Sequence, residues 1–259
     1  RPLSLLVWSL EQTMTDANAS GMIFGISVVV VTVMLRAVWF CFPRLKADIY
    51  DFMIIRMTAK WYATVLERVE GGSRVLDVGI GTASALVHGS NKALLESKNL
   101  IVVGIDYEAE YIKKAGEVVQ AAGLKDRVKL NCTSIYDPKL RQVFTGAARF
   151  DAAYFSGSIT LMPDPAAALK CSASMLTDNG VIYVTQTFQN RKSPFMEWLK
   201  PMLHRFTSVD FGKVVYHAEV AQIVAKAGMR IVEDTPVPGS IDTAAQTARL
   251  LVLKPTKKD

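Results

Sequence analysis

A glycine-rich turn at residues 77–83 is the part of the sequence whose residue types and spacing best suit ligand chemistry. It reads Asp-Val-Gly-Ile-Gly-Thr-Ala and follows the aliphatic pair Val75-Leu76. Glycine permits a tight turn and lets the backbone approach a ligand closely. The free N–H groups at the start of a following helix attract polar or anionic atoms. We therefore interpret this turn as a binding loop at the end of a strand.

A second carboxylate is expected beside this loop. The next predicted strand ends at Gly104-Ile105-Asp106, where an acid can accept hydrogen bonds from both ribose hydroxyls of an adenosine. The two features together indicate a cofactor that contains a nucleoside. A dinucleotide fingerprint needs Gly-x-Gly-x-x-Gly, and Ser84 stands at its sixth position. A nicotinamide-dependent reductase is therefore the less favoured alternative.

The elements that position these residues alternate between short β-branched runs and longer helical stretches, as in a parallel sheet with crossover helices. We expect strands at residues 74–78, 100–105, 128–131, 150–155, 180–187, 229–233 and 247–253. We expect helices at residues 48–70, 83–97, 109–122, 138–144, 165–176 and 218–227. A Pro/Gly-rich connection at 236–240 joins the last two strands without a helix, so the last strand should be antiparallel.

The pattern Asp-x-Gly-x-Gly-Thr-Ala, with Asp106 at the next strand end and two closing strands, resembles the class I S-adenosylmethionine-dependent methyltransferases. The loop is close to the Asp-x-Gly-x-Gly-Thr-Gly form of the quinone-biosynthesis and related small-molecule branch. The resemblance covers roughly residues 61–255. It implies an α/β fold with a Rossmann-like seven-stranded sheet, mostly parallel with the last strand antiparallel, and helices on both faces. It also implies S-adenosylmethionine as the cofactor.

The resemblance assigns roles to individual residues. Asp77 and the loop glycines would hold the methionine moiety and its amino group, Asp106 would bind the ribose, and Tyr107 would pack by the adenine. Residues 134–135 would flank the adenine ring, and the loop after the fourth strand would face the transferable methyl group. The cofactor-binding set is Asp77, Gly79, Gly81, Thr82, Asp106, Tyr107, Ser134, Ile135 and Ser156.

Two positions depart from the family pattern. Ala83 replaces the third glycine, which costs little if its backbone keeps a negative φ. Thr133 stands where the family often has an acid, so hydrogen bonds to the adenine would come from Ser134 or from the backbone. Both departures bear on how well the site binds the cofactor.

The catalytic residues are not identified by a motif. Methyl transfer from a sulfonium is an in-line displacement that needs mainly alignment, and a general base only if the acceptor atom carries a proton. The candidates for such a base are His217 and Tyr154, with His204 and Tyr216 also near the expected mouth of the site. The insert at 188–216 is rich in aromatic and aliphatic residues, which suits either an apolar acceptor or simple packing on the sheet edge.

Residues 21–42 form an apolar stretch with Arg36 as its single charge. As a helix it would rise about 33 Å, enough to cross the hydrocarbon core of a bilayer. Arg36 could snorkel to the headgroups, and aromatic residues at 39, 40 and 42 suit the membrane interface. We expect a single transmembrane helix, with a buried core helix or strand as the alternative. Basic residues follow the span, at 44, 46 and 56, so the positive-inside rule places the larger C-terminal part on the cytosolic or matrix side.

Composition, net charge and cysteine content exclude several classes of protein and of partner. Half of the 259 residues are apolar and 21% are charged, which excludes a disordered or collagen-like chain. Residues 1–42 hold two basic and two acidic residues, so the whole net charge of +6 lies on the rest, with 28 basic against 22 acidic residues. This charge is dispersed, so we expect no nucleic-acid partner. The three cysteines lack a metal-ligand spacing, so we expect neither a disulfide framework nor a metal site.

We thus expect an N-terminal extension at 1–20, a transmembrane helix at 21–42, an amphipathic linker helix at 43–72 and a methyltransferase domain at 73–259. The leading hypothesis is a membrane-anchored methyltransferase acting on a small or lipidic acceptor at the bilayer surface. The alternative is a methyltransferase-like accessory subunit of a larger membrane complex with little or no activity. In either case the chain would be a single-pass protein of an organelle membrane, for which the mitochondrial inner membrane is one candidate.

Overall fold

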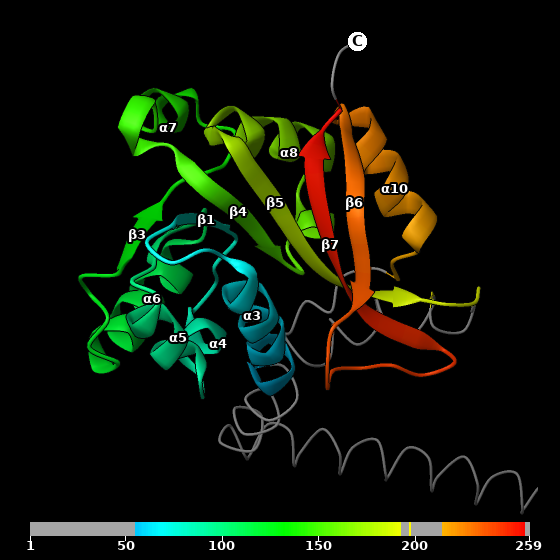
Figure 1. Cartoon of the computed structure of the whole chain (residues 1–259), viewed down its shortest axis with the longest axis horizontal. Helices are drawn as coiled ribbons and strands as arrows, with labels where there is room; N and C mark the ends of the chain where they lie inside the picture. Colours follow the sequence, from blue (N-terminus) through cyan, green and yellow to red (C-terminus); the bar gives the residue numbers. More distant parts are fainter. Residues whose placement is uncertain (1–54, 193–196, 198–213, 257–259) are drawn as a thin grey trace, which may run out of the picture. The chain divides into compact units, whose positions relative to one another are not determined.

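The computed structural model describes residues 55–192, 197 and 214–256, and Figure 1 traces their helices and strands. The strands are β1 (Arg74–Val78), β2 (Ile101–Asp106), β3 (Val128–Cys132), β4 (Phe150–Ser156), β5 (Leu176–Gln189), β6 (Met229–Pro236) and β7 (Gln246–Pro255). The helices are α3 (Arg56–Arg68), α4 (Ser84–Val87), α5 (Asn91–Ser97), α6 (Ala109–Ala121), α7 (Pro138–Val143), α8 (Pro165–Ser174) and α10 (His217–Lys226), with short 3-10 turns η2 (Gly146–Ala148) and η3 (Ile159–Leu161).

These strands form one sheet in the order β3-β2-β1-β4-β5-β7-β6. The pairs from β3 through β5 are parallel, whereas β7 runs antiparallel to both β5 and β6. This confirms the expected seven-stranded α/β sheet with an antiparallel last strand. The order reverses between β1 and β4, so their carboxyl ends form the switch point at which open α/β sheets bind ligands.

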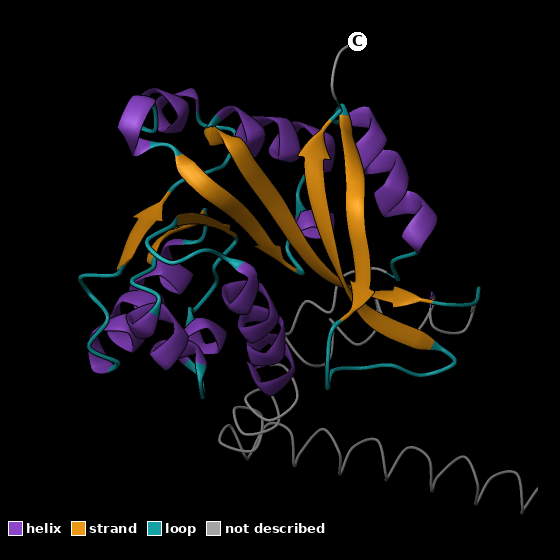
Figure 2. Ribbon diagram, viewed as in Figure 1, coloured by secondary structure: helices purple, strands orange, loops and turns teal. Residues whose placement is uncertain are grey.

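Helices cover both faces of the sheet (Figure 2). Along β1, Val75 packs into a cluster with α3, α4, α5 and α6. The next residue, Leu76, packs into a second cluster with α7, α8 and α10. Successive residues of a strand point to opposite faces, so apolar residues at both positions bury both sides of the strand. Asp77 follows in the same alternation and lies on the face covered by α3.

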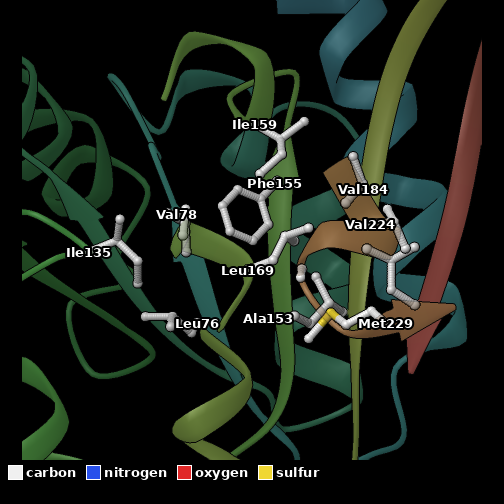
Figure 3. Packing of buried hydrophobic residues seen from close by; sticks show 14 of the residues in the cluster. Leu76, Val78, Ile135, Ala153, Phe155, Ile159, Leu169, Val184, Val224 and Met229 are labelled. Atoms are coloured by element: carbon white, nitrogen blue, oxygen red, sulfur yellow. The ribbon is translucent and has the colours of Figure 1, made fainter. Parts of the chain in front are cut away.

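The second cluster is the core beneath the strand ends that carry the site. Figure 3 shows Phe155, Ile159 and Leu169 grouped at its centre, and all three are fully buried. Full burial of such a side chain contributes roughly 1.5–3 kcal/mol. Phe155 and Ile159 bracket residues 156–158, so this packing fixes the loop that follows β4.

Two expected elements differ from the structure. The helix expected at 83–97 is split into α4 and α5, because His88 is extended and Gly89 has a φ of +59°. The helix expected at 165–176 ends at Ser174, and β5 already begins at Leu176. The remaining strands match the expected ones to within three residues at each end.

Helix α3 accounts for the part of the expected 48–70 helix that falls within the described residues. It ends at Arg68, two residues before the expected end of the helix. The Lys98 ammonium group supplies the cap, donating to the carbonyl oxygens of Leu66, Glu67 and Val69 at 3.0, 2.6 and 2.9 Å. A cation at a helix C-terminus satisfies exposed carbonyls and the helix dipole together.

The apolar stretch at 21–42 lies outside the described residues, and so do residues 48–54 of the expected linker helix. Within the ranges that the structure describes, no helix is both long and apolar enough to cross a membrane.

Candidate functional site

The glycine loop after β1 turns through two left-handed glycines. Gly79 has a φ of +77° and Gly81 a φ of +58°, and glycine alone adopts this region without strain. The N–H of Gly79 donates to the carbonyl of Ile105 on β2 at 2.9 Å. The loop is thereby held against the end of the neighbouring strand, as the sequence predicts.

Asp106 connects the end of β2 to this loop. Its Oδ2 accepts the N–H of Gly81 at 3.0 Å, and its Oδ1 accepts the N–H of Glu108 at 3.0 Å. The residue is 8% exposed. Each carboxylate oxygen can accept more than one hydrogen bond, so the acid keeps acceptor capacity for ribose hydroxyls while it fixes the loop. The predicted pairing of the loop with Asp106 is present.

Asp77, one residue before the end of β1, is buried and held by the helix that covers this face of the sheet. Its Oδ2 accepts a hydrogen bond from the Tyr62 hydroxyl of α3 at 2.7 Å. Its Oδ1 is also buried and has no hydrogen-bond partner among the described residues. Burial raises the pKa of Asp77 to about 7, with Tyr62 lowering and Asp106 raising it. A buried carboxylate oxygen left in this state is an acceptor in need of a donor or a cation.

Ala83 closes the loop in a conformation that the sequence did not lead us to expect. Its φ is +56°, in the left-handed region, whereas the replacement of glycine was expected to cost little only with a negative φ. The side chain is 2% exposed and packs in the cluster with α3 and α4. A non-glycine residue in this region costs roughly 1–2 kcal/mol, which this loop tolerates.

Tyr154, one of the two candidate bases, belongs to a buried polar cluster under α3. Its hydroxyl is 2.8 Å from the Thr185 hydroxyl, and its ring meets that of Tyr62 edge to face at 5.0 Å. Burial raises its pKa far above the usual value of a tyrosine. Ser156 lies close to both tyrosines, and its buried hydroxyl oxygen has no hydrogen-bond partner within the described chain.

The other expected cofactor residues have different environments. The Thr82 hydroxyl lies 2.9 Å from that of Ser84 at the start of α4. Tyr107 is 74% exposed directly after Asp106, so its ring is free to pack against a ligand. Ser134 accepts the N–H of Tyr136 at 3.3 Å. Ile135 is 3% exposed, and Figure 3 shows its side chain among those of the core cluster, so it packs in the core and not toward solvent.

His217, the second candidate base, begins α10 at the far end of the same sheet edge. Its Nε2 is 2.6 Å from Oδ2 of Asp234 on β6, and its ring lies 5.4 Å from that of Phe188. Asp234 also accepts from Nε of Arg249 at 2.5 Å. An acid that holds one imidazole nitrogen fixes the orientation of the ring. The structure does not bring His217 and Tyr154 together. Tyr154 of β4 packs in the cluster with α3, whereas His217 begins α10, which packs in the cluster on the other face of the sheet. His204 lies outside the described residues.

Tyr62 is the site residue that sequence reasoning missed. It lies in a predicted amphipathic helix, where an aromatic residue is ordinarily interpreted as part of the hydrophobic core. The adjacent residue also contributes, because Trp61 donates to the Ser240 hydroxyl at 3.0 Å and a Cβ on Gly157 would be 3.3 Å from its ring. No spacing in the sequence connects α3 with Asp77, so only the three-dimensional contact identifies this role.

These features fit S-adenosylmethionine. Gly81 has nothing within 4 Å of where a Cβ would lie, which leaves the loop backbone open to a ligand. Asp106 and the exposed Tyr107 suit an adenosine, and the unpaired Oδ1 of Asp77 suits a cationic amino group. Among the described residues, no group of three or more His, Cys, Asp or Glu side chains could hold a metal ion.

Comparisons with known proteins agree with this geometry. A curated phosphatidylethanolamine N-methyltransferase from Cereibacter sphaeroides is 25% identical over 199 residues, which cover 75% of this chain and 90% of that protein. A solved S-adenosylmethionine-dependent methyltransferase from Aquifex aeolicus has a TM-score of 0.57 at 18% identity, covering 80% of this chain and 97% of the other. One from Geobacter sulfurreducens, in complex with S-adenosyl-L-homocysteine, has a TM-score of 0.53 at 17% identity, covering 76% and 90%.

At these sequence identities, the similarity to solved structures shows the fold alone. The family assignment rests on the family model for the methyltransferase domain. This model matches residues 70–233, which is more than half of the chain. That range begins just before β1 and includes the glycine loop, Asp77 and Asp106. The chain belongs to the methyltransferase domain family, and S-adenosylmethionine is its cofactor.

Proposed function

We propose that this methyltransferase transfers the methyl group of S-adenosylmethionine to the headgroup of a lipid at a membrane surface, with an amine nitrogen as the acceptor atom. The observation that carries the proposal is the similarity, over 75% of the chain, to a protein named for N-methylation of phosphatidylethanolamine. The apolar stretch at 21–42 would hold the domain at the bilayer. The net charge of +6 after residue 42 would favour an anionic membrane face.

The proposed roles follow the geometry of the site. Asp77 would pair with the cofactor's amino group, Asp106 would accept from its ribose, and Tyr107 would pack against its adenine. Ser156 at the end of β4 and the following loop at 157–158 would face the sulfonium methyl. An alkylammonium headgroup must lose a proton before its nitrogen can attack a methyl group, so a base is needed for this acceptor. Of the two leading candidates, His217, which Asp234 orients, is the one with an exposed side chain, at 46%, whereas Tyr154 is buried.

The proposal includes a location. The basic residues that follow the apolar stretch would place the methyltransferase domain on the cytosolic or matrix side of an organelle membrane. The mitochondrial inner membrane is one candidate for this membrane. A lipid headgroup on that side would be the acceptor for a domain that begins at residue 73, after the expected linker at 43–72.

Methyl transfer to vesicles tests the function. The full-length protein in mild detergent would be given S-adenosylmethionine with a labelled methyl group and vesicles that contain phosphatidylethanolamine. We expect label in the lipid fraction, and none with vesicles of phosphatidylcholine alone, whose headgroup nitrogen is already fully methylated. Soluble phosphoethanolamine separates recognition of the headgroup from recognition of the membrane-bound lipid. Label in none of these acceptors would contradict the lipid-amine proposal.

A second candidate function is an accessory subunit of a membrane complex with little or no catalysis. The left-handed Ala83 in the cofactor loop favours it, because a non-glycine residue there is a departure with an energetic cost. Isothermal titration with S-adenosylmethionine and sizing in mild detergent separate the two. A protein that binds the cofactor and elutes without partners would be incompatible with the subunit function.

A further inference from the structure

We propose that Tyr62 is a positioning residue of the cofactor site, whose hydroxyl holds one carboxylate oxygen of Asp77 so that the other is presented to the ammonium group of the cofactor. The proposal rests on the role proposed above for Asp77. Tyr62 lies on α3, ahead of the residues 70–233 that match the methyltransferase family. The contact is therefore contributed by the segment that leads into the domain.

The geometry restrains both partners. The hydroxyl of Tyr62 is 2.7 Å from Asp77 Oδ2, its side chain is 4% exposed, and its ring is packed at 89° against that of Tyr154. Helix α3 is itself fixed to the domain, because Asn91 donates to the carbonyl of Ala59 at 2.9 Å. With Oδ2 occupied, Asp77 Oδ1 is the oxygen left without a partner among the described residues.

The groups around Asp77 provide no cation to pair with its Oδ1. Among the described residues, the titratable groups that face it are Tyr62 from α3, Asp106 from β2 and Tyr154 from β4, and none of these three is a cation. The ion pairs of the described chain do not include Asp77. With a pKa of about 7, the carboxyl is divided between its two forms at neutral pH. An ammonium group beside Oδ1 stabilises the ionised form, so binding is coupled to loss of a proton.

Two ligands isolate this coupling in the unmodified protein. S-Adenosyl-L-homocysteine carries the ammonium group, whereas 5′-methylthioadenosine shares the adenosyl part and lacks it. Titration calorimetry on the full chain between pH 5.5 and 8.5 should show affinity for the first rising about tenfold per pH unit below about 7 and levelling above it. The affinity for the second should stay flat. Equal pH dependence of the two ligands would overturn the proposal.

The Tyr62→Phe variant tests the hydroxyl itself. It removes the hydrogen bond that favours ionised Asp77, so the midpoint of the pH dependence should move up by about one unit. Tyr183→Phe is the matched control, since Tyr183 is buried in the same cluster without a bond to Asp77, and its midpoint should equal that of the unmodified protein. An unshifted midpoint in Tyr62→Phe would overturn the proposal.

The same measurements separate this proposal from the function on which it rests. If neither ligand binds at any pH, the assigned cofactor site fails and the positioning role fails with it. If the homocysteine ligand binds with a flat pH profile, the cofactor site stands and the role of Tyr62 is rejected. If Tyr62→Phe does not fold, a flat pH profile for the homocysteine ligand on the unmodified protein still rejects the proposal.

Discussion

A Cβ atom placed on Gly79 would lie 2.8 Å from the Cβ of Ser158, in the loop after β4. The Ser158 hydroxyl donates a 2.5 Å hydrogen bond to the carbonyl of Val78. Moving Ser158 away from an added Cβ would therefore break this bond. The φ of +77° at Gly79 adds backbone strain for any other residue. Gly79→Ala should therefore lower the free energy of unfolding by about 2–4 kcal/mol and weaken cofactor binding.

Gly81→Ala is the matched comparison, because nothing lies within 4 Å of the added Cβ. Its φ of +58° should cost about 1 kcal/mol in stability, yet the methyl group would enter the space that we assign to the cofactor. We expect binding of S-adenosyl-L-homocysteine to fall in both variants and stability to fall mainly in Gly79→Ala. Urea unfolding and calorimetry measure the two effects. Unchanged binding in Gly81→Ala would refute this placement of the cofactor.

The sequence predicted the local part of this site and missed the part made by distant contacts. The strands, the loop and Asp106 follow from alternation and glycine spacing, which depend on neighbouring residues. The contact of Tyr62 with Asp77 arises because α3 covers β1, and the orientation of His217 by Asp234 arises because α10 packs on β6. The left-handed Ala83 was missed for the opposite reason, since residue type alone argues against that conformation.

The buried acid should make the stability of the cofactor-free protein depend on pH. The pKa of Asp77 is about 7 in the folded protein against 3.8 as the reference value, so the folded state binds the proton more tightly than the unfolded state. Stability should therefore be lost as pH rises from about 4 through 7. Asp77→Asn removes this pH dependence. The free energy of unfolding of the variant, relative to that of the unmodified protein, should therefore rise by about 3 kcal/mol from pH 5 to pH 8. Urea unfolding at both pH values measures the difference.

The same variant should lose the cofactor while it gains stability at high pH, because an amide cannot pair with an ammonium group. This combination distinguishes a binding carboxylate from a structural one. A destabilised Asp77→Asn protein at pH 8 would show that the ionised acid has a partner that compensates for its burial.

The two candidate bases should respond differently to substitution. His217→Gln should lower kcat by about 100-fold or more with an amine acceptor and leave the affinity for S-adenosyl-L-homocysteine unchanged. Tyr154→Phe leaves the Thr185 hydroxyl without its 2.8 Å partner, so it should lower the free energy of unfolding by about 1 kcal/mol with a small effect on kcat. The reverse result, with Tyr154 controlling kcat, would mean that the buried cluster opens to the substrate.

Lys98 should stabilise the helix that carries Tyr62. Its ammonium group caps three carbonyl oxygens at the end of α3, which a methionine of similar length cannot do. Lys98→Met should lower the free energy of unfolding by about 1–2 kcal/mol and weaken cofactor binding through the displaced helix. Lys92→Met is the control, because Lys92 forms only a 3.8 Å exposed pair with Glu96 and should change neither quantity measurably. If both variants unfold at the same urea concentration as the unmodified protein, the cap contributes nothing to α3.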